Sequence, residues 1–342
     1  MLSGPPLVSV VMPVYHADEY LPEAIESIMN QKFRDFEFII ICDDPSEKTK
    51  EIIDKYQNTD KRINAIYQKR EGLVASLNKG FSMARGKYIA RMDADDISLP
   101  QRFEGQVKFL ENHQDIGICG TGILMKYHFI NKKWLYPSDD ASIKAKLLFS
   151  SPFAHPTIMI RRDILSKVEI VYDPEYKHAE DYELWVRCSE FTRFANLKIP
   201  LLVYRLNKSN ISRIFQKEQR ENSYRIQLSL LKKFGPLFTL DQLNIHSSMI
   251  FQNFEKSKIS VENIESWLMT LKEINEKQHL YPTIAFNKIL AEQWYEVCCC
   301  TTNLGQWNWK KFWESPLVQY LSLSSRRKFK FFIACLIRRA TN

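Results

Sequence analysis

The stretch GKYIARMDADDISLP, Gly86–Pro100, joins an apolar run directly to a cluster of acids. The run before Asp93 has the character of a buried strand, and Asp95 and Asp96 follow within three residues. Because like charges at this spacing repel, their ionised forms need a cationic partner or free access to water. The stretch therefore indicates either a solvated acidic turn or a site for a cation and its ligand.

Short apolar runs alternate with amphipathic segments around this stretch. We expect strands at Leu7–Val14, Phe36–Cys42, Ile63–Gln68 and Lys87–Met92, and helices at Asp18–Gln31, Ser46–Gln57 and Gly72–Gly86. Such alternation predicts βαβ units and a mostly parallel sheet, whose ligands bind beyond the carboxyl ends of the strands. The predicted rim of this sheet carries Tyr15, Asp43, Asp44, Asp93, Asp95 and Asp96.

The pattern is looser after the acidic stretch and becomes helical towards the end of the chain. We expect a helix at Arg102–Asn112, strands at Ile116–Tyr127, Phe153–Ile160 and Leu201–Arg205, and a helix after Ala179. Later helices are expected before Gly235 and at Ser260–Gln278 and Thr283–Thr301. No catalytic cluster is evident in these later helices.

Composition describes a folded protein with a basic end. The chain has 342 residues, 45% of them hydrophobic, and a net charge of +8. Residues 324–342 hold six Lys or Arg and no acid, which favours contact with a polyanion such as an anionic membrane.

Seven cysteines without paired Cys-x-x-Cys spacing fit a reduced, cytoplasmic protein. No run approaches the about 18 apolar residues that span a bilayer, and the start of the chain resembles a strand rather than a signal peptide.

The acids at the predicted rim suit either a ligand or a helix cap. Carboxylate oxygens are the ligands that Mg²⁺ and Mn²⁺ prefer, alongside water and substrate phosphates. Asp44 is the better candidate for a nucleobase or ribose contact, whereas Asp43 could cap the helix that begins near Ser46. Tyr15 could stack on a base or pack on the helix below it.

A second acidic pair lies in HAEDYELWVR, residues 178–187. Glu180 and Asp181 begin a predicted helix, and the helix dipole also favours acidic side chains at that end. With suitable geometry, such a carboxylate could act as general base towards a sugar hydroxyl. His155, before Pro156, is either a structural residue or a ligand.

Together these motifs resemble the inverting family 2 glycosyltransferases of the GT-A fold, particularly enzymes of bacterial capsule and lipopolysaccharide synthesis. The resemblance spans roughly residues 8–212. It rests on VSVVMPVY, FEFIIICDDPS, EGLVASLNKGFSMARGKYIARMDADDISLPQR, HPTIMIRR, AEDYELWVR and VYRLNKSNIS, which occur in the family's order. It implies an α/β catalytic domain at residues 1–215, with a nucleotide-binding half at about 1–100 and an acceptor half at about 101–215.

The resemblance also implies roles for individual residues. The nucleotide site would comprise Pro13, Tyr15, Asp44, Arg70 and Asp93, and the metal site would comprise Asp93, Asp95 and Asp96. Asp181, after Glu180, would be the general base of a single displacement, and His155 and Arg205 would lie on the acceptor and diphosphate side. The implied partners are a nucleotide-diphosphate sugar, most simply a UDP-sugar, a divalent metal (Mn²⁺ or Mg²⁺) and a glycan or lipid-linked acceptor, with no nucleic acid.

Four positions depart from the family pattern. His16 and Arg70 stand where Asn is frequent, and Pro45 replaces the usual Gly of the Asp-Asp-Gly-Ser turn. Asn207 stands where a histidine would follow Tyr-Arg-x, which puts one metal or phosphate contact in doubt. The Arg70 cation could reach a phosphate instead.

Residues 216–342 lie outside the resemblance and are expected to form a helical region. Within the basic tail, residues 324–342, Phe and Ile side chains alternate with Lys and Arg. Such a helix could lie in the inner face of the cytoplasmic membrane, or it could pack on the protein with a solvated charged face.

Two other functions compete with glycosyl transfer. A sugar nucleotidyltransferase would also use an α/β sheet and acidic metal ligands, but it needs a Gly-rich basic loop after its first strand, and PVYHADEYL has no glycine. A catalytically inactive, membrane-associated scaffold of a polysaccharide assembly complex is the other alternative, against which the intact Asp93, Asp95 and Asp181 argue.

Overall fold

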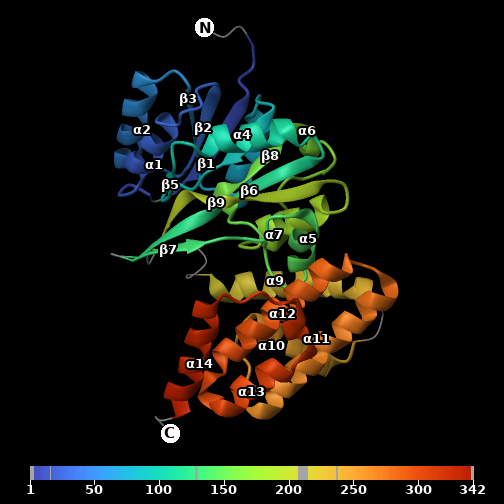
Figure 1. Cartoon of the computed structure of the whole chain (residues 1–342). Coiled ribbons are helices and arrows are strands. Elements are labelled where there is room, and N and C mark those ends of the chain that lie inside the picture. Colours follow the sequence, from blue (N-terminus) through green and yellow to red (C-terminus); the bar gives the residue numbers. More distant parts are fainter. Residues whose placement is uncertain (1–3, 16, 128–129, 207–214, 236–237, 340–342) are drawn as a thin grey trace. The chain divides into compact units, whose positions relative to one another are not determined.

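The structure is a computed structural model of the whole chain (Figure 1). It describes all residues except 1–3, 16, 128–129, 207–214, 236–237 and 340–342. The chain divides into two compact units, which are described separately. The first unit comprises Met1–Ile143 and Ser151–Ser223, and the second comprises Lys144–Ser150 and Tyr224–Asn342.

The first unit is built on one sheet, whose strand order is β3-β2-β1-β4-β8-β6-β9-β5, with β7 paired to β6. The predicted βαβ half is confirmed, since β3, β2, β1 and β4 are mutually parallel. Its strands are β1 (Val8–Val14), β2 (Phe36–Asp43), β3 (Ile63–Gln68) and β4 (Tyr88–Arg91), and its helices are α1 (Leu21–Met29), α2 (Glu47–Thr59) and α3 (Leu73–Met83). Because β2 is buried along its whole length, its middle, Phe38–Cys42, is a continuous apolar run.

The second half of the sheet is mixed rather than parallel. Its strands are β5 (Ile97–Ser98), β6 (Ile116–Tyr127), β7 (Ile130–Trp134), β8 (Met159–Arg161) and β9 (Arg193–Arg205). Strand β8 runs antiparallel to both β4 and β6, and β9 runs parallel to β6. The helices of this half are α4 (Arg102–Asn112), α5 (Asp140–Lys146), α6 (Arg162–Leu165) and α7 (Glu180–Cys188), with a 3₁₀ turn at Pro174–Tyr176.

One predicted strand is partly wrong. Residues 153–160 do not form a continuous strand, because His155–Thr157 forms a 3₁₀ turn and β8 begins only at Met159. Pro156 has no backbone N–H to give to a sheet and sits instead at the start of the turn. His155 is therefore the first residue of this turn and precedes β8.

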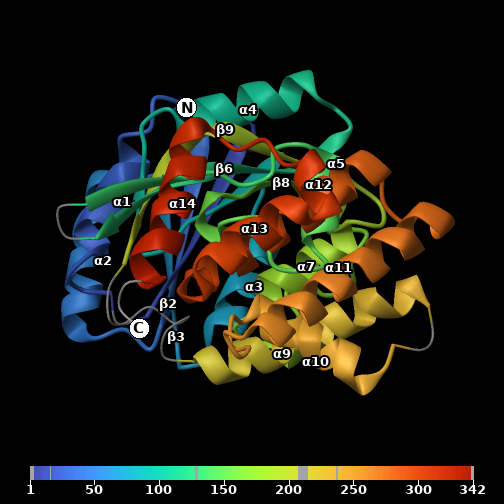
Figure 2. The ribbon, with the colours of Figure 1, turned by 60° about the horizontal axis from the view of Figure 1, so that its bottom comes forward.

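The second unit is helical, coloured yellow to red in Figures 1 and 2. Its helices are α9 (Gln216–Leu231, which begins in the first unit), α10 (Leu240–Ile250), α11 (Lys258–Gln278), α12 (Thr283–Cys300), α13 (Gln306–Glu314) and α14 (Ser325–Arg339). Short 3₁₀ turns occur at Lys232–Phe234, Thr302–Leu304 and Pro316–Tyr320. Among the described residues, no helix is both long enough and apolar enough to cross a membrane.

A buried polar cluster fixes the start of β4 against β1. The Ser9 hydroxyl donates to Glu37 Oε1 at 2.6 Å and accepts the backbone N–H of Gly86 at 2.8 Å. The Arg85 guanidinium forms an ion pair with Glu37 at 2.6 Å. These bonds set the register from which β4 delivers its acids to the other end of the sheet.

The backbone at Gly86 lies close to that of β1, where a side chain has no room. We therefore expect Gly86→Ala to destabilise the protein by about 2–4 kcal/mol. A Cβ atom on Gly86 would lie 2.6 Å from the Ser9 backbone nitrogen and 2.8 Å from the Val8 carbonyl carbon. Gly105 in α4 provides the matched control, because a Cβ there would lie 3.6 Å from Leu201. Urea denaturation should show Gly105→Ala neutral or stabilising, and an equal loss in both variants would contradict this account.

Candidate active site

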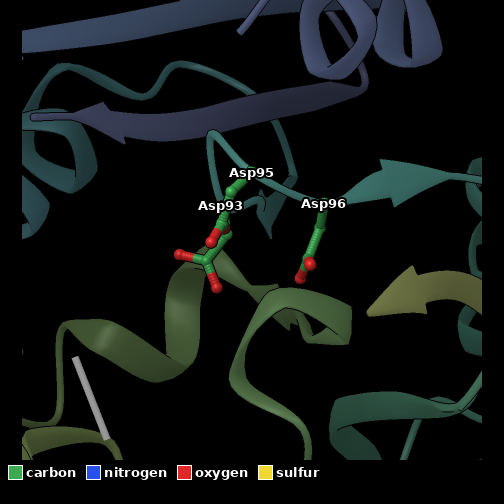
Figure 3. A group of neighbouring side chains, drawn as sticks. All are labelled: Asp93, Asp95 and Asp96. Atoms are coloured by element: carbon green, nitrogen blue, oxygen red, sulfur yellow. The ribbon is translucent and has the colours of Figure 1, made fainter. Parts of the chain in front are cut away.

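Three acids cluster in the loop that follows β4. Figure 3 shows Asp93, Asp95 and Asp96 leaving this loop, and one carboxylate oxygen from each lies within 4.8 Å of the others. The backbone N–H of Met92 donates to Val11 at 3.0 Å, which holds the chain against β1 up to the first acid. The structure therefore brings together all three residues that the sequence predicted as a metal site.

Asp96 is the buried member of the cluster. Its Oδ1 accepts the backbone N–H of Arg205 at 3.0 Å, whereas its Oδ2 is buried without a hydrogen-bond partner. Burial and the neighbouring charges of Asp93 and Asp95 raise the pKa of this carboxyl well above its ordinary value. An added divalent cation would relieve both the repulsion and the unsatisfied oxygen, so the donor set fits Mg²⁺ or Mn²⁺.

Arg91, which the sequence prediction missed, is the cation nearest to these acids. Its side chain is only 4% exposed, and it forms an ion pair with Asp93. Burial alone would lower the pKa of the guanidinium, but the charge and hydrogen bond of Asp93 raise it. Burial raises the pKa of the Glu180 and Asp181 carboxyls, and the charge of Arg91 opposes that rise. An arginine inside an otherwise apolar strand was the signal available in the sequence.

Arg205 braces the acidic loop from β9. Its Nη1 donates to the carbonyl of Asp95 at 3.1 Å, and its guanidinium also forms an ion pair with Glu23 of α1. The guanidinium carbon lies 5.1 Å from the centre of the Tyr20 ring. Arg205 thus lies beside the acids, with contacts that hold the loop in place, and its role on the acceptor and diphosphate side stays a prediction.

The two aspartates at the end of β2 have different environments. Asp43 is buried, and its carboxylate accepts the backbone N–H groups of Glu71 at 2.8 Å and Gly72 at 2.9 Å. It therefore anchors the start of α3, not the helix near Ser46, whose first turn the Ser46 hydroxyl caps by itself. Asp44 is exposed and adopts a positive φ of 55° at the end of the strand.

Tyr15 and Arg70 meet at the exposed end of the sheet. The guanidinium carbon of Arg70 lies 4.6 Å from the centre of the Tyr15 ring, and Tyr15 is 40% exposed. The exposed part of the ring is accessible to a ligand, and whether Tyr15 stacks on a base stays a prediction. Pro13, one residue from the end of β1, pairs with Ile41 and lies partly buried at the same edge. His16 and Asn207, which depart from the family pattern, lie outside the described residues.

Glu180 and Asp181 occupy the first turn of α7. Burial and the charge of Asp181 raise the pKa of Glu180 to about 7. Burial also raises the pKa of Asp181, although the hydroxyl of Ser151, which donates to Asp181 Oδ2 at 3.4 Å, opposes the shift. Both carboxyls are within electrostatic reach of Arg91, so the base candidates and the acidic loop share one cation.

His155 lies in a tightly packed aromatic environment. Its Nε2 is 2.9 Å from the Tyr172 hydroxyl, and its ring contacts Trp185 edge to face at 6.1 Å. Burial and the charge of Arg91 lower the pKa of His155 well below its ordinary value, which favours the neutral ring. The Asn78 amide donates to the backbone carbonyl of Tyr172 at 2.8 Å, and its side-chain oxygen accepts the Tyr172 backbone N–H at 2.9 Å. Neither Tyr172 nor Asn78 was predicted from the sequence.

The fold and this acidic rim define a GT-A glycosyltransferase, and the comparisons agree. Residues 9–169 match the model of glycosyl transferase family 2. An uncharacterized glycosyltransferase of Methanocaldococcus jannaschii is 42% identical over 232 residues, which cover 64% of this chain and 77% of that protein. The O-antigen biosynthesis glycosyltransferase WbnJ of Escherichia coli is 37% identical over 213 residues, which cover 59% of this chain and 81% of WbnJ. The chain belongs to glycosyltransferase family 2 and is a transferase.

Solved structures confirm the fold. S. aureus TarS 1–349 in complex with UDP-GlcNAc aligns with a TM-score of 0.56 at 16% identity, covering 95% of this chain and 89% of that one. The mannosyltransferase PcManGT of Pyrobaculum calidifontis, in complex with GDP-Man and Mn²⁺, aligns with a TM-score of 0.55 at 12% identity, covering 99% and 88%.

Removing the buried cation should cost far more stability than removing an exposed one. We expect Arg91→Met to destabilise the protein by about 3–5 kcal/mol at pH 7, because the partly buried Asp93 carboxylate loses its partner. Arg193 pairs with Asp115 at 2.6 Å on the surface, with both side chains more than half exposed. Arg193→Met is the matched control and should cost less than about 1 kcal/mol in chemical denaturation. Equal losses would show that Arg91 has no special electrostatic role.

Proposed function

We propose that this protein is an inverting glycosyltransferase that moves a sugar from a nucleotide-diphosphate donor to a hydroxyl of a glycan or glycolipid acceptor in surface polysaccharide synthesis. The observation that carries the proposal is the acidic loop after β4, with its three carboxylates within 4.8 Å, in a chain of family 2. Membership of a glycosyltransferase family argues against the nucleotidyltransferase alternative, and the intact Asp93, Asp95 and Asp181 argue against an inactive scaffold.

The donor would bind at the carboxyl ends of the parallel strands. Tyr15 and Asp44 are exposed there and suit a base and a ribose, and the Arg70 cation beside Tyr15 suits a phosphate. Because the structures of TarS and PcManGT hold UDP-GlcNAc and GDP-Man respectively, a nucleotide sugar is the natural donor class. We propose a UDP-sugar.

The leaving group would be held by the acidic loop. Asp93 and Asp95 would bind a divalent cation, with Asp96 behind them, and the proposal is supported by the Mn²⁺ in the PcManGT complex. When bound, such a cation supplies Lewis-acid stabilisation of the charge on the departing diphosphate. Arg91 forms an ion pair with Asp93, and Arg205 donates to the backbone carbonyl of Asp95 in the same loop.

The acceptor hydroxyl would lose its proton to Asp181. The raised pKa of Asp181 improves its strength as a base, while Arg91 and Ser151 favour its ionised form. The hydroxyl oxygen attacks the anomeric carbon as the bond to the diphosphate breaks, which inverts the configuration in a single displacement. His155, neutral and bound to Tyr172, would line the acceptor side without adding a charge. The similarity to WbnJ favours an O-antigen type of acceptor.

Asp181→Asn should lower kcat by about 10²–10⁴-fold while leaving nucleotide affinity nearly unchanged, because the amide cannot accept the proton. Transfer assays with a panel of nucleotide sugars, paired with calorimetric titration of the nucleoside diphosphate, measure the two effects. In the unsubstituted protein, the acidic limb of activity should lie at higher pH than the ordinary titration of an aspartate, since burial raises the pKa of Asp181. Full activity of Asp181→Asn would remove this residue from the mechanism.

A nucleoside diphosphate should raise the melting temperature in the presence of Mn²⁺, with little effect in EDTA, because binding to the native state alone stabilises it. Asp95→Asn should abolish the metal-dependent part of that shift. Asp139, which accepts the Ser142 backbone N–H at 2.9 Å outside the site, offers Asp139→Asn as a control that should keep the shift. If no nucleoside diphosphate stabilises the protein with metal, the proposed donor class is wrong.

A further inference from the structure

The basic tail forms helix α14, which packs on its own unit through one face. Phe331 is 3% exposed and Cys335, one turn later, is 1% exposed. The Phe331 ring contacts the rings of Trp309 at 5.5 Å and Phe312 at 5.1 Å, both on α13. Figure 2 shows α13 and α14 labelled next to each other. This face of α14 therefore packs within the helical unit.

A different face of α14 presents large apolar side chains outward. Phe329 is 65% exposed, Phe332 is 37% exposed and Ile337 is 60% exposed. On a helix of about 3.6 residues per turn, Phe329 projects between Phe332 and Ile337 and roughly opposite the buried Phe331 and Cys335. Phe332 borders the packed face and also contacts Trp309. Trp313 of α13, itself 37% exposed, continues this surface, since Trp309 contacts both Phe332 at 5.1 Å and Trp313 at 5.6 Å. We call Trp313, Phe329, Phe332 and Ile337 the aromatic face.

Cations surround the aromatic face. The side chains of Arg326, Arg327, Lys328 and Lys330 are exposed, and the Lys328 ammonium lies 5.4 Å from the centre of the Trp313 ring. Residues 315–342 contain no Asp or Glu. Two copies of this protein joined through the aromatic face would bring like charges together, so a second copy is a poor occupant. An anionic, partly apolar surface complements both features.

We propose that the aromatic face of α13 and α14 docks on an anionic lipid bilayer, with the apolar side chains at the depth of the headgroups and the cations against lipid phosphates. Basic residues next to an exposed apolar stripe are the features that bind interfacial helices to negatively charged membranes. A peripheral attachment of this kind would keep the enzyme where a lipid-linked acceptor is presented. The docking itself needs neither donor nor acceptor, so it stands or fails separately from the proposed transfer reaction.

The test is flotation of the full-length protein with lipid vesicles in the absence of any nucleotide. The protein should float with phosphatidylcholine vesicles that contain phosphatidylglycerol and remain at the bottom with pure phosphatidylcholine. Replacing Phe329, Phe332 and Ile337 together by Ser should weaken binding by about tenfold or more, and Arg326→Glu with Lys330→Glu should do the same. High salt should weaken the binding of the unsubstituted protein.

Matched controls come from exposed apolar residues elsewhere in the same unit. Ile259 at the start of α11 is 70% exposed and Ile284 in α12 is 82% exposed, so Ile259→Ser with Ile284→Ser removes a similar amount of apolar surface. This control should bind vesicles like the unsubstituted protein, and all variants should keep their melting temperature. No binding to anionic vesicles, equal binding by the triple Ser variant, or concentration-dependent dimerisation lost in that variant would overturn the proposal.

Discussion

The ion pair between Arg91 and Asp93 is the interaction on which the site depends. Placing a guanidinium inside a sheet is costly unless an anion compensates it, and Asp93 supplies that anion at the point where β4 ends. The same cation favours the ionised forms of Glu180 and Asp181 at the start of α7. The acidic loop and the first turn of α7, which are distant in the chain, thus lie near the same buried guanidinium.

Backbone anchoring gives this edge its rigidity. Asp43 holds the start of α3, Arg205 holds the acidic loop, and Ser9 fixes the other end of β4. These side chains bond mainly to backbone groups, and these bonds hold the loops in position. Tyr15 and Asp44 are exposed beside loops that these bonds hold in position. Such an arrangement suits a preformed ligand site better than a site that changes conformation on binding.

The sequence predicted the features that depend on local pattern. The first four strands, the helices between them and the Ser46 cap follow from apolar periodicity and capping chemistry, and the acids after β4 follow from strand polarity. It missed features that depend on distant partners. Arg91 resembled an interruption of an apolar run, and its ion pair with Asp93 together with the nearby acids of α7 explains it. Asp43 anchors a helix 29 residues later, and Pro156 replaced a strand with a turn because its own backbone cannot join a ladder.

The most direct test of the account is a crystal structure with Mn²⁺ and UDP, with data collected at the manganese absorption edge. The account predicts one anomalous peak in contact with the Asp93 or Asp95 carboxylate and with the diphosphate oxygens, and a uracil ring beside Tyr15. A nucleotide bound elsewhere, or bound at this edge with manganese away from the acidic loop, would contradict it.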